Sequence, residues 1–217
     1  MRGEDAGGEG SSMNLDVAIL AGGKATRLRG LWDQSKFLVP VGGVPLINRI
    51  FENLESLSPR VVYLLLDDRG PQIMAHVKEM KTTLLIRPVF EGKPIGTSGA
   101  LRGLLMIHES VPVDLRAPLM VLNHDTLPLY PLTALAEHHA QHHGAWATAA
   151  FVYLEESWRD VYAGASVLSV EAQREICADH RTHDFPVHLL GAQRYHVPGF
   201  LDVGTPEGFK QAQEYRE

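Results

Sequence analysis

The sequence has 217 residues, of which 45% are hydrophobic and 21% are charged, and its formal net charge is -6. These proportions are typical of a globular protein, and no apolar run approaches the roughly 18 residues that a membrane-spanning helix needs, so a disordered chain and a membrane protein are both excluded. The net negative charge argues against a nucleic-acid-binding surface, which is normally basic.

The first residues differ in composition from the rest of the chain. Residues 1–13 are rich in Gly, Glu and Ser and contain almost nothing to bury, so we expect a flexible tail, with Met13 as an alternative start. Residues 14–217 are expected to form one domain, because this length suits a single α/β unit. Its first strand should begin at Asp16, where the apolar run VAIL leads to Gly22 and Gly23.

Helical and strand patterns then alternate along the chain. Helical spacing of apolar residues predicts helices over residues 45–57, 72–81, 98–108 and 132–143, and short apolar runs predict strands over 60–66, 82–86, 118–123 and 145–153. After residue 152 the rhythm weakens, with a strand and a helix over 165–176 capped by Ser169, and a short strand, a turn and a closing helix from Pro206. The alternation predicts an α/β fold, a three-layer, Rossmann-like, mostly parallel sheet with helices on both faces.

The loop after the first strand is a candidate phosphate-binding loop. Ligands of open α/β sheets bind beyond the carboxyl ends of the strands, and residues 20–28 at this position read LAGGKATRL. Glycines let backbone N–H groups approach phosphate oxygens, and the guanidinium of Arg27 can hold two oxygens. The loop matches neither the dinucleotide fingerprint nor the Walker A pattern. Taken alone, an ordinary glycine-rich turn with a surface arginine is an equally good interpretation.

Charged residues follow at two further strand ends and in one loop. Asp125 comes directly after the strand PLMVLN, and Asp202 ends the short apolar segment before Gly204. A carboxylate desolvated at such a position needs a cation or strong hydrogen bonds, and Mg²⁺ is the natural candidate. Lys36 could neutralise a triphosphate from the opposite side. The alternatives are turn or cap aspartates and a solvated lysine.

Five segments in chain order carry a family resemblance. They are GGKATRL at 22–28, SKFLVPVGGVPLI at 35–47, EGKPIGTSGAL at 91–101, VLNHDTL at 121–127 and FLDVGTPE at 200–207. Together they resemble the signature segments of the sugar-1-phosphate nucleotidyltransferase family, and the short length and the GGxATRL form resemble its compact heptose- or mannose-1-phosphate guanylyltransferase-like members.

The resemblance implies a fold of the nucleotidyltransferase or GT-A-like type and a reaction. A nucleoside triphosphate, with GTP preferred, and a sugar 1-phosphate such as heptose or mannose 1-phosphate would give an NDP-sugar and pyrophosphate in a Mg²⁺-dependent reaction, with neither nucleic acid nor membrane as partner. It implies catalytic roles for Arg27, Lys36 and Asp125, with Asp125 and Asp202 as the metal ligands. The nucleotide would be bound by Leu20, Ala21, Gly22, Gly23, Thr26, Glu91, Gly96 and Thr97, and the sugar phosphate by Asn123 and Arg159.

Two departures from the family pattern leave alternatives open. Ala25 stands where glycine is usual, and the sugar-binding half, at about residues 153–200, is shortened and has no counterpart of the family's sugar-phosphate lysine. Arg159 is its candidate replacement, with a solvated loop arginine as the equal alternative. A non-catalytic binding subunit of the same fold and a molybdopterin-type or other acceptor specificity are the competing hypotheses.

The remaining features are given structural interpretations. Four histidines at 138, 139, 142 and 143 have metal-like helical spacing but should lie on the polar side of their helix, and Trp32, Trp146 and Trp158 are expected to be packing groups. The one cysteine, Cys177, cannot form an internal disulfide and is expected to be buried, and the N-terminus lacks the apolar core of a secretory signal. A cytoplasmic location is therefore expected, with the oligomeric state left open and a homo-oligomer as one alternative.

Overall fold

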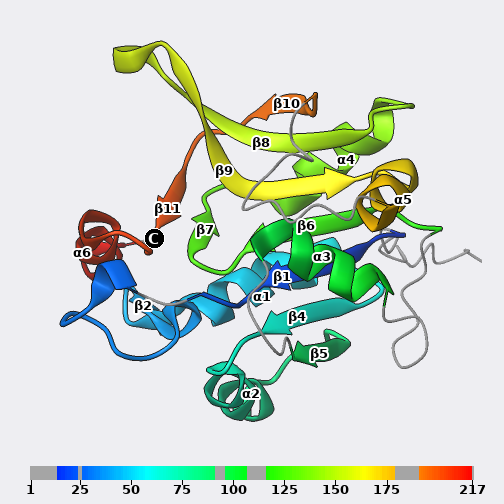
Figure 1. Ribbon diagram of the computed structural model, residues 1–217. Helices are drawn as coiled ribbons and strands as arrows, with labels where there is room; N and C mark the ends of the chain where they lie inside the picture. The colour runs from blue at the N-terminus through cyan, green and yellow to red at the C-terminus, as the bar shows by residue number, and fades with distance from the viewer. Residues whose placement is uncertain (1–13, 24–25, 91–95, 107–115, 179–190, 217) are drawn as a thin grey trace, which may run out of the picture.

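A seven-stranded sheet forms the centre of the computed structural model, which describes residues 14–23, 26–90, 96–106, 116–178 and 191–216 (Figure 1). Its strands, in spatial order, are β10 (Gln193–His196), β8 (Ala147–Leu154), β9 (Arg159–Leu168), β6 (Leu119–Asn123), β1 (Asp16–Leu20), β4 (Val62–Leu66) and β5 (Ile86–Phe90). Strand β9 runs antiparallel to both of its neighbours, and the other pairs are parallel. The expected mostly parallel sheet is confirmed.

Helices cover both faces of this sheet, as Figure 1 shows. Helices α1 (Leu46–Leu57), α2 (Gly70–Glu79) and α4 (Leu132–Gln141) bury apolar side chains in one core, and α3 (Gly96–Met106) and α5 (Val170–Ala178) bury theirs in a second. Strand β1 supplies Val17 and Ile19 to the first core and Ala18 to the second, because alternate residues of a strand point to opposite faces. The three-layer arrangement is therefore confirmed.

The strand after α2 lies further along the chain than its sequence pattern predicts. We expected it over residues 82–86, but β5 spans Ile86–Phe90. Thr82 Oγ1 and the Thr83 N–H both donate to Glu55 Oε1, at 2.7 and 3.2 Å, which holds this stretch as a connection to α1. Pro88 lies within β5, which is compatible with its position as an edge strand, where a proline need not donate to a neighbour.

Several short elements bring distant parts of the chain together beside the end of β6. The 3-10 helices η1 (Thr26–Leu28) and η2 (Lys36–Leu38) precede the small hairpin of β2 (Pro40–Val41) and β3 (Val44–Pro45). Strand β7 (Thr126–Pro128) pairs antiparallel with β11 (Phe200–Asp202), so that Asp202 lies opposite Thr126. Helix α6 (Pro206–Glu214) follows and begins at the predicted residue.

The expected sugar-binding half contains a hairpin that projects from the body of the molecule (Figure 1). Strands β8 and β9 are joined through the 3-10 helix η3 (Glu155–Ser157). Trp158 at this turn is 84% exposed, so its interpretation as a packing group was wrong. In the parts of the chain that the structure describes, no helix is both long and apolar enough to cross a membrane.

Among the four histidines at and after the end of α4, His142 and His143 are exposed as expected, whereas His139 is not. His139 is buried rather than on a polar face, and its Nδ1 lies 2.8 Å from Thr148 Oγ1 of β8. His138 packs between the rings of His142 and Tyr195, with centroid distances of 4.1 and 4.6 Å. These rings are part of the packing of α4 against β8 and β10.

Candidate active site

Two carboxylates and one ammonium group converge on Gly204, which follows β11. A β-carbon on this glycine would lie 2.7 Å from Asp125 Oδ2, 2.9 Å from Asp202 Oδ1 and 3.0 Å from Lys36 Nζ. The pairing of β7 with β11 produces this meeting, because it places Asp202 opposite the residue that follows Asp125. The structure thus brings together three of the predicted site residues, although Lys36 and Asp202 are 166 positions apart in the sequence.

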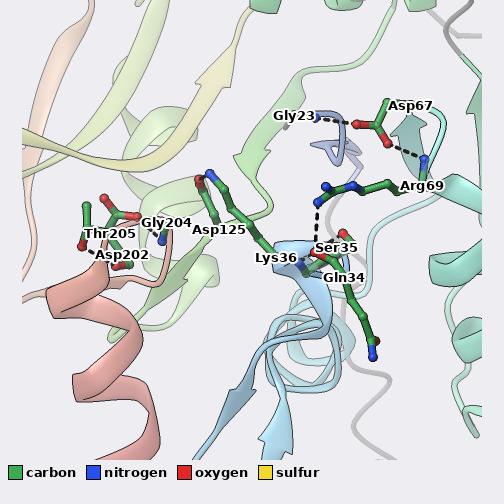
Figure 2. Close-up of polar contacts among 11 residues, drawn as sticks. Gly23, Gln34, Ser35, Lys36, Asp67, Arg69, Asp125, Asp202, Gly204 and Thr205 are labelled. Atoms are coloured by element: carbon green, nitrogen blue, oxygen red, sulfur yellow. Dashed lines mark hydrogen bonds and ion pairs between the residues drawn. The ribbon is translucent and has the colours of Figure 1, made fainter. Parts of the chain in front are cut away.

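Lys36 is the first residue of η2 and is held in place from both ends. Ser35 caps the short helix, because its Oγ accepts the N–H of Phe37 at 3.3 Å. The side chain of Lys36 is only 8% exposed, and its Nζ lies 2.8 Å from Asp125 Oδ2 (Figure 2). A desolvated ammonium is costly unless it is paired, so this ion pair accounts for a lysine in so buried a position.

The charges around this ion pair determine the ionisation of Asp125. Burial tends to raise the pKa of Asp125, but the neighbouring His124 and Lys36 outweigh burial and hold that pKa below its usual range. Burial lowers the pKa of His124 itself, so the contribution of its imidazole to the charge around Asp125 is confined to acidic pH. Lys36 is the direct ion-pair partner of the Asp125 carboxylate.

The pKa of Asp202 is raised, whereas that of Asp125 is lowered. Burial raises the pKa of Asp202, and the negative charge of Asp125 raises it further, while a hydrogen bond from the Gly204 N–H and the charges of Arg27 and Lys36 oppose them. The Gly204 N–H donates to Asp202 Oδ1 at 2.8 Å. Arg27 lies on η1 and is exposed, whereas Lys36 is buried.

The predicted nucleotide-binding residues begin where β1 ends. Leu20 is the last residue of this strand, and the Ala21 N–H donates to the Leu65 carbonyl of β4 at 2.9 Å. Gly23 has a φ of 144°, a region that favours glycine, and its N–H donates to Asp67 Oδ2 at 2.8 Å. The N–H of Gly23 is therefore engaged within the protein rather than presented to a phosphate, whereas Gly22 is half-buried next to it.

The other predicted residues are placed as follows. Thr26 begins η1 and is exposed, Asn123 ends β6 and is half-buried, and Gly96 and Thr97 open helix α3. Lys24, Ala25 and Glu91 lie outside the described residues. Gly96 and Thr97, which were predicted to bind the nucleotide, thus lie at a helix N-terminus, where backbone amides favour an anionic or carbonyl group.

Arg159 is set apart from this group. It is the exposed first residue of β9, whereas the part of β9 that contacts the site is Gly164, whose β-carbon would lie 2.7 Å from Thr126 Cβ. Five strand residues span roughly 16 Å. The structure therefore does not bring Arg159 together with Asp125, and its exposed position favours a solvated arginine.

Three residues of the site were missed by sequence reasoning. Asp67, directly after β4, supports the glycine loop, His124 packs edge-on against Phe37 with ring centroids 6.1 Å apart, and Gly204 provides the space in which the charged groups meet. Asp67 obeys the rule that polar residues at the carboxyl ends of strands line the site, so the same signal that selected Asp125 could have selected it.

The donor set of the site suits a hard divalent cation. Mg²⁺ in proteins takes oxygen ligands and is often held by one or two carboxylates together with phosphates and water. Asp125 and Asp202 provide two such carboxylates around one side-chain-free glycine. In the described ranges no group of three His, Cys, Asp or Glu side chains could hold a metal.

Comparisons with known proteins show which family the chain resembles in sequence. The MobA-like NTP transferase domain family matches residues 17–185. Mannose-1-phosphate guanyltransferase from Aspergillus fumigatus is 33% identical over 131 residues, which are 59% of this chain and 35% of that protein. The same enzyme from Pichia angusta is 26% identical over 226 residues, 88% of this chain and 61% of that protein. The chain thus spans about a third to three fifths of the length of these relatives.

Solved structures share the fold. HddC from Yersinia pseudotuberculosis superposes with a TM-score of 0.70 at 21% identity, over 92% of this chain and 98% of that chain. The UTP-bound UGPase from Acinetobacter baumannii superposes with a TM-score of 0.71 at 12% identity, over 93% and 92% of the two chains. The family match covers most of the chain and includes the glycine loop, Lys36 and Asp125. The chain therefore belongs to the MobA-like NTP transferase domain family.

Proposed function

We propose that this protein transfers a nucleotidyl group from a nucleoside triphosphate to a sugar 1-phosphate in the presence of Mg²⁺, releasing pyrophosphate. The observation that carries the proposal is the meeting of Lys36, Asp125 and Asp202 around Gly204. Supporting it, matching relatives are mannose-1-phosphate guanyltransferases, and HddC has been solved in complex with GMP-PN. GTP with a mannose or heptose 1-phosphate is accordingly the preferred substrate pair, and the cytoplasm is the proposed location.

The proposed reaction requires aligned substrates and stabilisation of negative charge on the phosphates, but no general base. A phosphate oxygen of the sugar 1-phosphate is already anionic at neutral pH and attacks the α-phosphorus in line with the departing pyrophosphate. Mg²⁺, held by Asp125 and Asp202, would supply positive charge beside the phosphates. Lys36 contributes the second positive charge from a nearly water-free position, where electrostatic stabilisation is strong. Arg27 on η1 contributes the third from the solvent side.

A pyrophosphate-release assay tests the proposal. Four nucleoside triphosphates are each combined with Mg²⁺ and with mannose, heptose, glucose and N-acetylglucosamine 1-phosphates, and alcohol acceptors are included for the molybdopterin-type alternative. We expect release to require both substrates and to be fastest with GTP. If the wild-type protein binds nucleotide but none of the acceptors tested leads to pyrophosphate release, the proposed enzyme is wrong and the non-catalytic alternative is supported.

A pair of variants tests the metal assignment. Asp125→Asn removes one charge from the site and should lower kcat by roughly 10²–10³-fold, because a preorganised electrostatic contact is lost. Circular dichroism should show a folded protein. Asp33→Asn, which changes an exposed aspartate near the loop, is the matched control and should leave kcat unchanged. Wild-type turnover by Asp125→Asn contradicts its role as a metal ligand.

A further inference from the structure

The turn that follows β4 touches both of the segments that carry the proposed phosphate-binding cations. Asp67 is buried, with 8% of its surface exposed, and stands at the carboxyl end of β4. Its Oδ2 accepts the Gly23 N–H at 2.8 Å and its Oδ1 accepts the Arg69 N–H at 2.9 Å. The first of these bonds joins residues 44 positions apart and reaches the glycine loop that leads to Arg27.

Arg69 extends the same connection to the second segment. Its Nη1 donates to the carbonyl of Gln34 at 3.0 Å, and Gln34 is two residues before Lys36. The next carbonyl, that of Ser35, accepts the indole N–H of Trp32 at 2.9 Å. Figure 2 shows the continuous path from Gly23 through Asp67 and Arg69 to the residues before Lys36. Both carbonyls that precede Lys36 are therefore fixed by side chains.

From these contacts we infer that Asp67 and Arg69 are positioning residues for the proposed reaction: their turn sets the distance between the glycine loop and the Lys36 segment. The inference rests on the proposed function, because the phosphates of the nucleotide would lie between these two segments. Gly22 and Gly23 have no side chains to anchor this part of the loop, so an external acceptor for the Gly23 N–H restrains its backbone. Preorganisation of this kind lowers the cost of binding and keeps reacting groups aligned.

An ordinary turn explains only part of the contacts. The bond from the Arg69 N–H back to Asp67 is a local one that any Asx turn makes. The bonds to Gly23 and to Gln34 cross 44 and 35 positions of sequence and end on the two segments of the site. The test therefore needs variants that remove one of these two long-range bonds while keeping the local bond between Asp67 and the Arg69 N–H.

Asp67→Asn is designed to remove the long-range bond to Gly23 alone. An asparagine side chain has a single acceptor oxygen, so it can serve only one of the two N–H groups, and we expect it to keep the local Asx-turn bond to the Arg69 N–H and to lose the bond to Gly23. We expect the Kd for GTP in the presence of Mg²⁺, measured by titration calorimetry, to rise by about 10- to 100-fold, the size of effect seen when a supporting contact of a site is removed. The KM for the sugar 1-phosphate should change by less than about threefold, because the acceptor is not bound by this loop.

Arg69→Met is designed to remove the long-range bond to the Gln34 carbonyl alone. Methionine keeps the unbranched stem but has no donor for the Gln34 carbonyl. We expect kcat to fall by about 10-fold with little change in the Kd for GTP, since a misplaced Lys36 affects the reaction more than the binding of the nucleotide. Asp68→Asn, which makes the same charge change as Asp67→Asn at the exposed neighbouring position, is the control and should match the wild type in all three measurements.

The outcomes are distinguishable. Equal Kd values for wild type and Asp67→Asn, or a loss that the Asp68→Asn control shares, overturn the inference while leaving the proposed function intact. A rise in Kd that only mirrors a smaller folded fraction in urea unfolding curves overturns it as well, since the role would then be structural. A wild-type protein that binds no nucleotide overturns the proposed function, and the inference with it.

Discussion

Gly204 is required for space rather than for backbone freedom. Three charged atoms lie within 3.0 Å of the position that its β-carbon would take, and two of them are the predicted metal-ligating oxygens. Real β-carbons are essentially never found at such distances, so any side chain here must displace a carboxylate or the ammonium group. An absent side chain is thus what allows three groups of the site to share one small volume.

Gly204→Ala is therefore expected to damage the reaction more than the fold. The added methyl group must displace Asp125, Asp202 or Lys36, and a displacement near 1 Å can cost about 10²-fold in kcat. Steady-state kinetics and thermal unfolding of the same samples measure the two effects. The control is Gly103→Ala in α3, where nothing lies within 4 Å of the new β-carbon and where alanine is the better helix former. Wild-type kcat in Gly204→Ala would show that the carboxylates do not act at this point.

Sequence reasoning could select the members of the site, but not the way in which they meet. Lys36, Asp125 and Asp202 were predicted because each belongs to a resembling segment, and the structure places them together. Asp67 follows a strand as Asp125 does but belongs to no resembling segment, and its contact with Gly23, like the role of Gly204, depends on distances between segments far apart in the chain. Those distances arise from the β7–β11 pairing and from the neighbouring positions of β1 and β4 in the sheet. A linear pattern contains neither.

At the scale of elements, the end of β11 and the start of α6 determine the position of Asp202. Thr205 is the N-cap of α6, and its Oγ1 accepts the Gly208 N–H at 3.1 Å. Gly208 in turn allows the helix to approach closely, because its β-carbon would lie only 1.7 Å from the Asp202 carbonyl oxygen. The cap and the glycine therefore fix α6 directly against the strand that ends in a proposed metal ligand.

Loss of this cap should be measurable in stability. Thr205→Ala leaves the Gly208 N–H without its acceptor and should cost about 1 kcal/mol, which corresponds to roughly 2–4 °C in Tm for a chain of this size. Thr205→Ser keeps a hydroxyl oxygen at the same position and should retain most of that stability. Calorimetric unfolding of the two variants gives the comparison. Equal Tm values for the alanine and serine variants would mean that the hydroxyl does not cap the helix in solution.

Most elements were predictable because their patterns are local. Helix α1 was expected over residues 45–57 and spans Leu46–Leu57, and α6 begins at Pro206 as expected. Strand β5 was misplaced because residues 82–86 have strand-like side chains, whereas the side chain of Glu55 binds two of them and makes them a connection. This contact comes from another helix, so local propensity had no information about it.

At the scale of the whole molecule, different strands position different parts of the proposed site. The parallel strands β1 and β4 end in the glycine loop and in Asp67, while β6, β7 and β11 bring the two carboxylates together. Strands β8, β9 and β10 extend the sheet on the other side and contact α4 through the buried His139 and through the half-buried rings of His138 and Tyr195. This second part includes His139, whose burial gives the fold a dependence on pH that is separate from the proposed site.

Stability should fall as the pH drops below about 6.5, partly because of His139. Burial, followed by the neighbouring His138 and His142, lowers the pKa of His139, while the unfolded chain has the ordinary value near 6.5. Between these two pKa values the unfolded state binds more protons than the folded state, so this contribution to stability is complete above pH 6.5 and is lost as the pH falls. The slope for one proton is at most about 1.4 kcal/mol per pH unit.

His139→Asn isolates this contribution, because the amide can still bond to Thr148 but does not titrate. Urea unfolding at pH 7.5, 6.5 and 5.5 should show a smaller fall in stability for this variant than for the wild type. Other buried histidines with a lowered pKa, such as His124, contribute equally to both proteins and cancel in the difference. His143→Gln, at an exposed position of the same segment, should follow the wild-type curve. Parallel curves for the wild type and His139→Asn would show that the pKa of His139 in the folded protein is close to its unfolded value, and that the ring is more accessible to water than its packing against β8 implies.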